Sequence, residues 1–188
     1  MNVFHAQTSI HPIILFQMNI RIEILAEHSK RQTTKIVNFV GDDKNRFKIL
    51  MDLFLHDEYR VVQRSGWMVS VCSIAHPQLI KPYFKQMVAY LSKEGTHSAV
   101  RRNILRILQF VDVPKSLQGK LVDVCFKFLI SKEEPVAVKV FAMTVLTTIA
   151  KQNPDLKHEI KIVIEDMIPY GSPGIRVRGK KMLRELNR

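Results

Sequence analysis

Apolar residues recur along the chain in a helical rhythm that repeats every 38 residues. Three windows superpose, and each opens on a valine: Val62, Val100 and Val138. Side chains four, seven, eight and eleven positions after each valine would share one face of a helix. These positions hold Gly66, Val69, Ser70 and Ser73; Ile104, Ile107, Leu108 and Val111; and Ala142, Val145, Leu146 and Ile149. The pattern predicts three equivalent amphipathic helices.

A fourth copy lies near the C-terminus, where two registers compete. Matching the letters pairs Val177 with Val100, which places Lys181 at the buried fourth position. Starting at Ile175 instead fills the buried positions with Gly179, Met182, Leu183 and Leu186. Burying an unpaired lysine costs far more than changing a loop by one or two residues, so we expect the register that starts at Ile175.

A second family of helical segments alternates with these helices. Its superposable apolar positions are Met87, Val88 and Leu91; Cys125, Phe126 and Leu129; and Ile164, Met167 and Ile168. Each segment opens near a proline, which the first turn of a helix tolerates because its N–H groups have no intrahelical partner. The prolines are Pro77, Pro114 and Pro154. Each repeating unit is therefore predicted to be a helical hairpin.

The region before these units also has helical periodicity. Residues 43 to 56 predict another first helix, with Asp42 or Asp43 as its N-cap. Residues 19 to 40 predict two shorter helices, split near Ser29, which caps the second. The predicted fold class is all-α, an α-α superhelix of about five stacked helical hairpins, with about ten helices and no strands.

Helix pairs every 38 residues, a proline near the start of the first helix, and Val-Arg or Val-Lys opening the second resemble HEAT repeats. This is an armadillo-like α-solenoid family, and the resemblance covers roughly residues 43 to 188. Tetratricopeptide repeats are disfavoured because their period is about 34 residues. The resemblance implies a curved stack whose second helices line the concave surface, and a binding scaffold without catalysis.

The sequence departs from the HEAT pattern in its acidic residues. That pattern places an Asp shortly before Val-Arg, so that acidic and basic side chains of successive turns form a ladder. Acidic residues precede Val62 and Val138, as Asp57 with Glu58 and as Glu133 with Glu134, but none precedes Val100 or Ile175. The ladder is incomplete, and several basic side chains lack an expected partner.

Seven basic side chains near the openings of the second helices are candidates for binding a partner or a polyanion: Arg64, Arg101, Arg102, Arg106, Lys139, Arg176 and Arg178. In one interpretation they form a basic ridge at the concave rim that contacts phosphates or carboxylates. In the other, Arg101 and Lys139 pair with acidic residues of neighbouring turns and the rest are solvated. Arg102 and Arg106 are the strongest candidates for binding. Like charges four residues apart on a helix are mildly destabilising, so helix stability does not explain this pair.

Two further side chains are predicted to lie in the core. Trp67 has the apolar equivalents Leu105 and Met143, which favours an inter-repeat core residue over a platform for stacking bases. Cys125 shares its position with Met87 and Ile164, which favours a core thiol over a reactive one.

The composition, with 46% apolar residues in 188, is that of one globular domain. The excess of 29 Lys and Arg over 17 Asp and Glu gives a net charge of +12, which attracts polyanions of any kind. Two cysteines 53 residues apart, and no apolar stretch of about 20 residues, predict a cytoplasmic protein without a membrane span.

Residues 1–17 carry no Asp, Glu, Lys or Arg and form a predicted N-terminal arm before a single domain, 18–188. The arm is disordered, an edge element or a translated leader.

Catalytic motifs are missing from the sequence. The seven histidines show no metal-ligand spacing, and there is no phosphate-binding glycine loop or nucleophile elbow. We therefore expect no enzyme and no catalytic, cofactor or metal site. Two functions remain. The first is a scaffold that binds a protein partner through its concave surface. The alternative is a nucleic-acid-binding solenoid similar in plan to the HEAT-like DNA alkylation repair glycosylases, although a single Trp does not supply the concave aromatic set those enzymes use.

Overall fold

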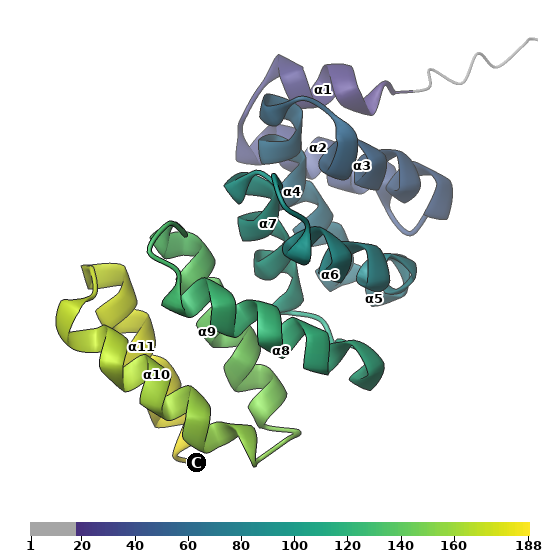
Figure 1. Cartoon of the computed structure of the whole chain (residues 1–188). Coiled ribbons are helices and arrows are strands. Elements are labelled where there is room, and N and C mark those ends of the chain that lie inside the picture. The colour runs from purple at the N-terminus through teal and green to yellow at the C-terminus, as the bar shows by residue number, and fades with distance from the viewer. Residues whose placement is uncertain (1–17) are drawn as a thin grey trace, which may run out of the picture.

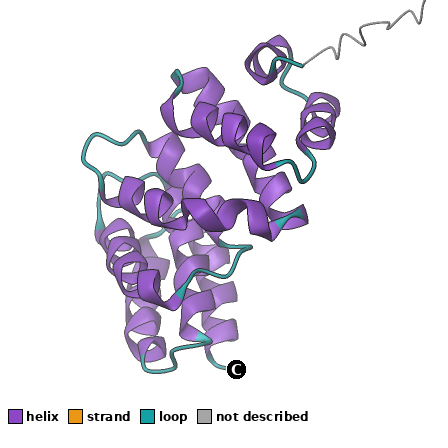
Figure 2. Ribbon diagram, turned by 90° about the vertical axis from the view of Figure 1, so that its right-hand side faces the viewer, coloured by secondary structure: helices purple, strands orange, loops and turns teal. Residues whose placement is uncertain are grey.

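The computed structural model describes residues 18–188, which form eleven α-helices and one short 3-10 helix without any strand. Figure 1 shows the helices in chain order from α1 to the C-terminus, and Figure 2 shows the described residues as helices and loops only. The helices are α1 (Ile20–Ala26), α2 (Lys30–Val40), α3 (Lys44–His56), α4 (Tyr59–Ala75), α5 (Pro77–Ile80), α6 (Phe84–Ser92), α7 (Ser98–Leu108), α8 (Lys115–Ile130), α9 (Val136–Ala150), α10 (Leu156–Tyr170) and α11 (Pro173–Leu186). The predicted arm, residues 1–17, lies outside the described part.

Short polar side chains begin the N-terminal helices, as the sequence predicts. The Ser29 hydroxyl accepts a hydrogen bond from the Gln32 N–H at 3.1 Å at the start of α2. The Asp43 carboxylate accepts from the N–H groups of Asn45 and Arg46 at 2.8 and 3.0 Å at the start of α3. Each cap satisfies N–H groups that have no partner inside the helix. Both predicted caps are confirmed.

Proline also interrupts one helix. The first helix of the third hairpin is divided into α5 and α6 by the 3-10 turn Lys81–Tyr83, which contains Pro82. Proline has no N–H to donate to an α-helical hydrogen bond, so the chain tightens there before α6 continues. The sequence pattern predicts the start of this helix at Pro77 but not the break.

The helices form five hairpins in two layers. The first layer holds α1, α3, α5 with α6, α8 and α10, and the second layer holds α2, α4, α7, α9 and α11. In the second layer, α4 packs on α7, α7 on α9, and α9 on α11, whereas consecutive first helices touch less. The layer whose members approach more closely lies on the inside of a curved stack. The second helices therefore form the inner layer and the first helices the outer layer.

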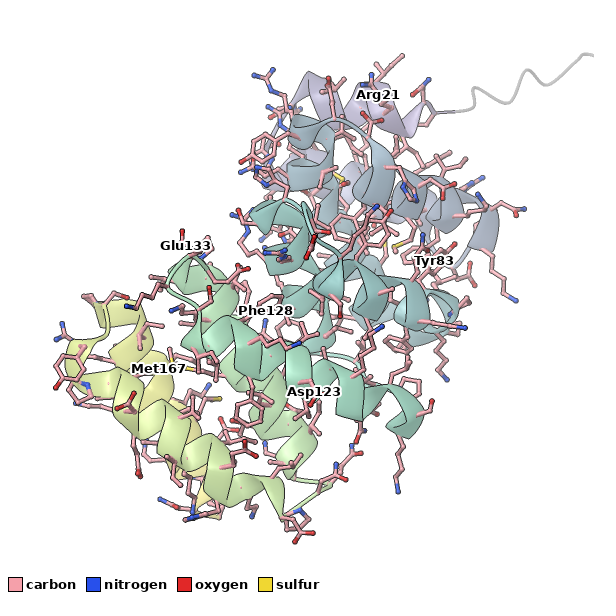
Figure 3. The ribbon with its side chains drawn as sticks, viewed as in Figure 1. Arg21, Tyr83, Asp123, Phe128, Glu133 and Met167 are labelled. Atoms are coloured by element: carbon pink, nitrogen blue, oxygen red, sulfur yellow. The ribbon has the colours of Figure 1, made fainter. Side chains whose placement is uncertain are left out.

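The repeating apolar stripe is the core between these layers. Positions four, seven, eight and eleven residues after Val62, Val100 and Val138 are all buried. In the last copy Gly179 and Met182 are buried, while Val177 is 72% exposed and Lys181 is exposed. The register that starts at Ile175 is therefore confirmed. Figure 3 labels Phe128 of α8 and Met167 of α10, two outer-layer side chains that help to fill the core.

Gly66 marks the closest approach between two inner helices. A Cβ atom added there would lie 2.4 to 2.9 Å from side-chain atoms of Asn103 on α7, which is buried. Only glycine leaves room for α4 and α7 to pack at this distance. This contact sets the spacing of two consecutive inner helices.

Candidate functional site

The inner layer differs from the outer layer in charge. Helices α2, α4, α7 and α9 contain no Asp or Glu, and α11 contains one, Glu185, which pairs with Lys151 at 3.0 Å. Each of these five helices carries at least one Lys or Arg. In the outer layer, α1, α3, α8 and α10 each contain acidic residues. The concave side therefore presents a positive wall almost free of carboxylates.

A groove of about 370 Å³ opens along this wall, and four inner helices contribute to it. We call it the inner groove. Its lining side chains combine apolar with basic and amide groups: Trp67, Ser70, Val71 and Ile74 from α4; Arg106, Gln109 and Phe110 from or just after α7; Phe141 from α9; and Arg178 from α11. None of them is acidic. Ile74 and Phe110 remain 50% and 59% exposed, so large apolar surface faces solvent inside a positive groove.

Trp67 corrects a prediction. The sequence places it in the core with Leu105 and Met143, both of which are fully buried. In the structure Trp67 is only half-buried and lines the inner groove, while the next residue, Met68, is buried instead. Helix α4 keeps the register of the repeating stripe, but it packs against α1, α2 and α3 as well as α7, and Met68 instead of Trp67 contributes to its buried face. The Trp67 side chain is therefore part of the groove lining.

Two of the seven predicted basic side chains meet in the groove. Arg178 reaches from α11 across two repeats, and its Nη1 donates hydrogen bonds to Oε1 of Gln109 at 3.2 Å and to the hydroxyl of Thr144. Arg106 is half-buried and makes no side-chain hydrogen bond or ion pair with the described residues. The groove thus holds one guanidinium that is fixed in place and one that is unpaired among residues 18–188.

Arg101 lies at the rim and is paired internally. Its Nη1 makes an ion pair with Glu134, in the loop before α9, and its guanidinium carbon lies 5.5 Å from the centre of the Phe128 ring. The Arg101 side chain is 22% exposed and that of Glu134 is 8% exposed. The pair is a rung of the acid–base ladder between consecutive repeats, and it matches the internal-pairing interpretation for this residue. Figure 3 labels the neighbouring Glu133 in the same loop.

Arg64 also has an internal contact. Its Nη1 donates to the backbone carbonyls of Ile24 and Leu25, each at 3.0 Å, at the C-terminal end of α1. These carbonyls have no partner within the helix, and a cation is favourable at the negative end of the helix dipole. Arg64 therefore ties α4 to the first hairpin.

An ion pair also joins the same two hairpins. Arg21 of α1, labelled in Figure 3, contacts both carboxylate oxygens of Asp57 at 2.8 and 3.0 Å. The hydrogen bond from Arg21 lowers the pKa of Asp57, against the opposing effect of partial burial. Asp57 lies in the loop before α4, so this pair and Arg64 together fasten α1 to the rest of the stack.

The other three predicted side chains lie outside the groove. Arg102 and Lys139 are half-buried and Arg176 is exposed, and none has a side-chain partner among the described residues. Arg102 shares a face of α7 with Arg106, one turn away. A binding role for all seven basic residues stays a prediction, but the structure separates the groove pair Arg106 and Arg178 from the internally paired Arg64 and Arg101.

Sequence reasoning missed the apolar half of the groove. Ile74 and Phe141 lie on inner helices and Phe110 lies just after α7, all at positions outside the repeating core stripe. The signal available in the sequence was the presence of large apolar residues at positions that the repeating core stripe does not bury. That signal is weak for a single residue, because exposed apolar side chains are common on protein surfaces.

Both thiols are buried between the layers. Cys72 of α4 and Cys125 of α8 are free and fully buried. Burial raises the pKa of the Cys72 thiol to about 12 and raises the pKa of Cys125 as well. The core position predicted for Cys125 is confirmed.

The described residues show no metal-binding arrangement. Within residues 18–188, no three His, Cys, Asp or Glu side chains gather as metal ligands would. In the same part of the chain, no helix has the length and apolar character needed to cross a bilayer.

Comparison with known proteins agrees with the architecture. A family model described as a HEAT repeat domain matches residues 20–186, from the start of α1 to the end of α11. No curated protein and no solved structure matches the chain. The family match covers all five hairpins, including the first, which the sequence resemblance left out. The chain therefore belongs to the HEAT-repeat family.

Proposed function

We propose that this chain is a non-catalytic scaffold that binds a protein partner through the inner groove. The observation that supports the proposal is the exposed apolar surface of Phe110 and Ile74 within a concave, four-helix wall. Exposed apolar surface in a groove gains free energy when a partner covers it, by about 1.5–3 kcal/mol for a large side chain. Grouped apolar side chains rimmed by polar ones are typical of protein-binding surfaces.

Affinity capture from native lysate with paired variants tests this function. The immobilised wild-type chain is compared with a Phe110→Ser variant and with Ile162→Ser, which removes a similarly exposed apolar side chain from α10 in the outer layer. We expect at least one protein that wild type and Ile162→Ser retain and Phe110→Ser loses. Retention of every captured protein by Phe110→Ser would contradict binding through the groove.

Nucleic acid is the second candidate, and the charge of the inner layer favours it. Four inner helices lack acidic residues, so a phosphate backbone along them would meet little repulsion. Neutralising about four phosphates predicts a plot of log affinity against log salt with a slope near −3 to −4. We expect the double variant Arg102→Ala/Arg106→Ala to reduce that slope by about two for duplex DNA. An equally shallow salt dependence of DNA binding in the wild type and the double variant would rule out the nucleic-acid function.

A further inference from the structure

We infer that the inner groove binds an acidic segment of a partner protein, in which a large apolar side chain lies next to a carboxylate. The inference rests on the proposed function and names the chemistry of the occupant. Two properties of the groove carry it: an apolar floor and an excess of guanidinium groups without acidic neighbours.

The apolar half of the groove selects for a side chain rather than a base. Trp67, Phe110 and Phe141 offer aromatic surface, and bases as well as side chains stack on aromatic rings. Ile74, half exposed, adds a branched aliphatic surface, which gains from contact with another apolar group but offers no stacking plane. A leucine, isoleucine or aromatic side chain covers both kinds of surface, whereas a sugar-phosphate backbone covers neither.

The charged half selects for a carboxylate. Arg106 is half-buried on the groove wall without a partner in the described part of the chain, so a bound anion would neutralise it. Arg178 is held across the groove by Gln109 and Thr144, while its Nε and Nη2 donors remain without partners among residues 18–188. A planar guanidinium pairs with carboxylate oxygens through two parallel hydrogen bonds, and a fixed side chain loses little freedom on binding.

Charge complementarity therefore determines the sign of the occupant. No groove-lining residue is acidic, and the α4 and α7 helices that supply most of the wall contain no Asp or Glu. A basic or neutral segment would leave Arg106 unpaired beneath it, and that cost works against binding. An acidic segment with an apolar anchor satisfies both halves of the groove together.

Selection from a library of random displayed peptides on the immobilised chain tests this inference directly. We expect enriched peptides to contain Leu, Ile, Phe or Trp within a few residues of Asp or Glu. A labelled synthetic copy of the most enriched peptide is then titrated with the chain and its variants by fluorescence polarisation. Arg106→Gln and Phe110→Ser should each weaken binding about tenfold or more.

Matched controls distinguish a specific effect of the groove residues from a general effect of losing positive charge or apolar surface. Arg184→Gln removes the same charge from an exposed position on α11 outside the groove, and Tyr170→Ser removes an aromatic side chain that is almost fully exposed on α10. Both should bind the peptide within about twofold of wild type. Circular dichroism of each variant establishes that the fold is retained.

The possible failures are distinguishable. Enriched peptides without acidic residues, or an affinity that Arg106→Gln and Phe110→Ser leave unchanged, overturn the acidic occupant while protein binding stands. A chain that selects no peptide but binds duplex DNA with a slope reduced by Arg102→Ala/Arg106→Ala overturns the protein-binding function together with this inference.

Discussion

The inner and outer helix layers share one core but differ in what they offer to solvent. Both contribute to the stripe of buried apolar residues between them, and Cys72 and Cys125 show equal burial from the two sides. The outer helices α1, α3, α8 and α10 carry charges of both signs, such as the pair Lys48 and Asp52 at 2.6 Å on α3. The inner helices carry basic residues almost without acidic ones. The fold therefore depends on the shared core, and the two layers differ in the charge of their solvent faces.

The charge pattern of the inner layer costs stability. Arg102 and Arg106 are four residues apart on α7, where like charges destabilise a helix by about 0.2–0.5 kcal/mol. The exposed pair on α3 contributes about as little in the favourable direction. This small cost is consistent with a surface that serves a partner, because no internal contact in the described residues requires the charges of Arg102 and Arg106.

Glycine substitution gives the largest contrast between the layers. We expect Gly66→Ala on inner helix α4 to lower the free energy of unfolding by about 1–3 kcal/mol, because its Cβ would overlap the buried Asn103 side chain. Gly119→Ala on outer helix α8 meets no atom within 4 Å and should raise stability by up to about 1 kcal/mol through helix propensity. Urea unfolding followed by circular dichroism measures both. A stable Gly66→Ala protein would mean that α4 and α7 are less closely packed.

The next contrast concerns ion pairs. We expect Glu134→Gln to destabilise the protein by about 1–2 kcal/mol, because it leaves the partly buried Arg101 guanidinium without its countercharge between two repeats. The matched substitution Asp52→Asn breaks an exposed pair within one helix and should cost less than about 0.5 kcal/mol. Thermal unfolding of the two variants at low and high salt gives the comparison. Equal effects would show that the pair at the rim is as solvated as the one on α3.

The same contact shows how far sequence reasoning reaches. The sequence predicts the hairpins, the buried stripe and the Ile175 register from periodicity. It predicts the caps Ser29 and either Asp42 or Asp43 from short polar side chains that can make a local hydrogen bond. It offers Glu134 only as one of several partners for Arg101, since the choice depends on how a loop lies against the preceding repeat. Tertiary packing decides such contacts.

The groove was harder to predict for the same reason. Arg102 and Arg106 stand out from their spacing alone, but the partners of Arg178 lie 34 and 69 residues away, on α9 and just after α7. Trp67 was misplaced because α4 also packs against the first hairpin, and Met68 is buried in place of Trp67. Periodicity fixes which helices pair, whereas the rotation of each helix follows from all of its neighbours.

Two arginines of the inner layer are expected to differ in their contribution to stability. Arg64→Gln removes hydrogen bonds to the C-terminal carbonyls of α1 and should cost about 1 kcal/mol, less than a buried charge interaction because the side chain is half-buried. Arg106→Gln breaks no internal contact and should change stability by less than about 0.5 kcal/mol. Hydrogen exchange should show faster exchange in α1 and α2 for the first variant alone. Faster exchange in both would indicate that Arg106 supports the fold.

The smallest expected difference between the layers is in thiol chemistry. Cys72 from the inner layer and Cys125 from the outer layer both have raised pKa values because burial disfavours the thiolate, which is the reactive form. A thiol in the unfolded chain ionises near pH 8.5, so at pH 8 a substantial fraction of it is thiolate, which reacts with iodoacetamide. Both thiols of the folded chain should react far more slowly. Because the folded pKa is the higher one, this contribution to stability is present below about pH 8.5 and is lost as pH rises toward the folded value. Mass spectrometry of alkylated tryptic peptides reads each site separately. Selective labelling of Cys72 in the folded protein would contradict this expectation. It would show that the inner layer opens to solvent more readily than the outer layer.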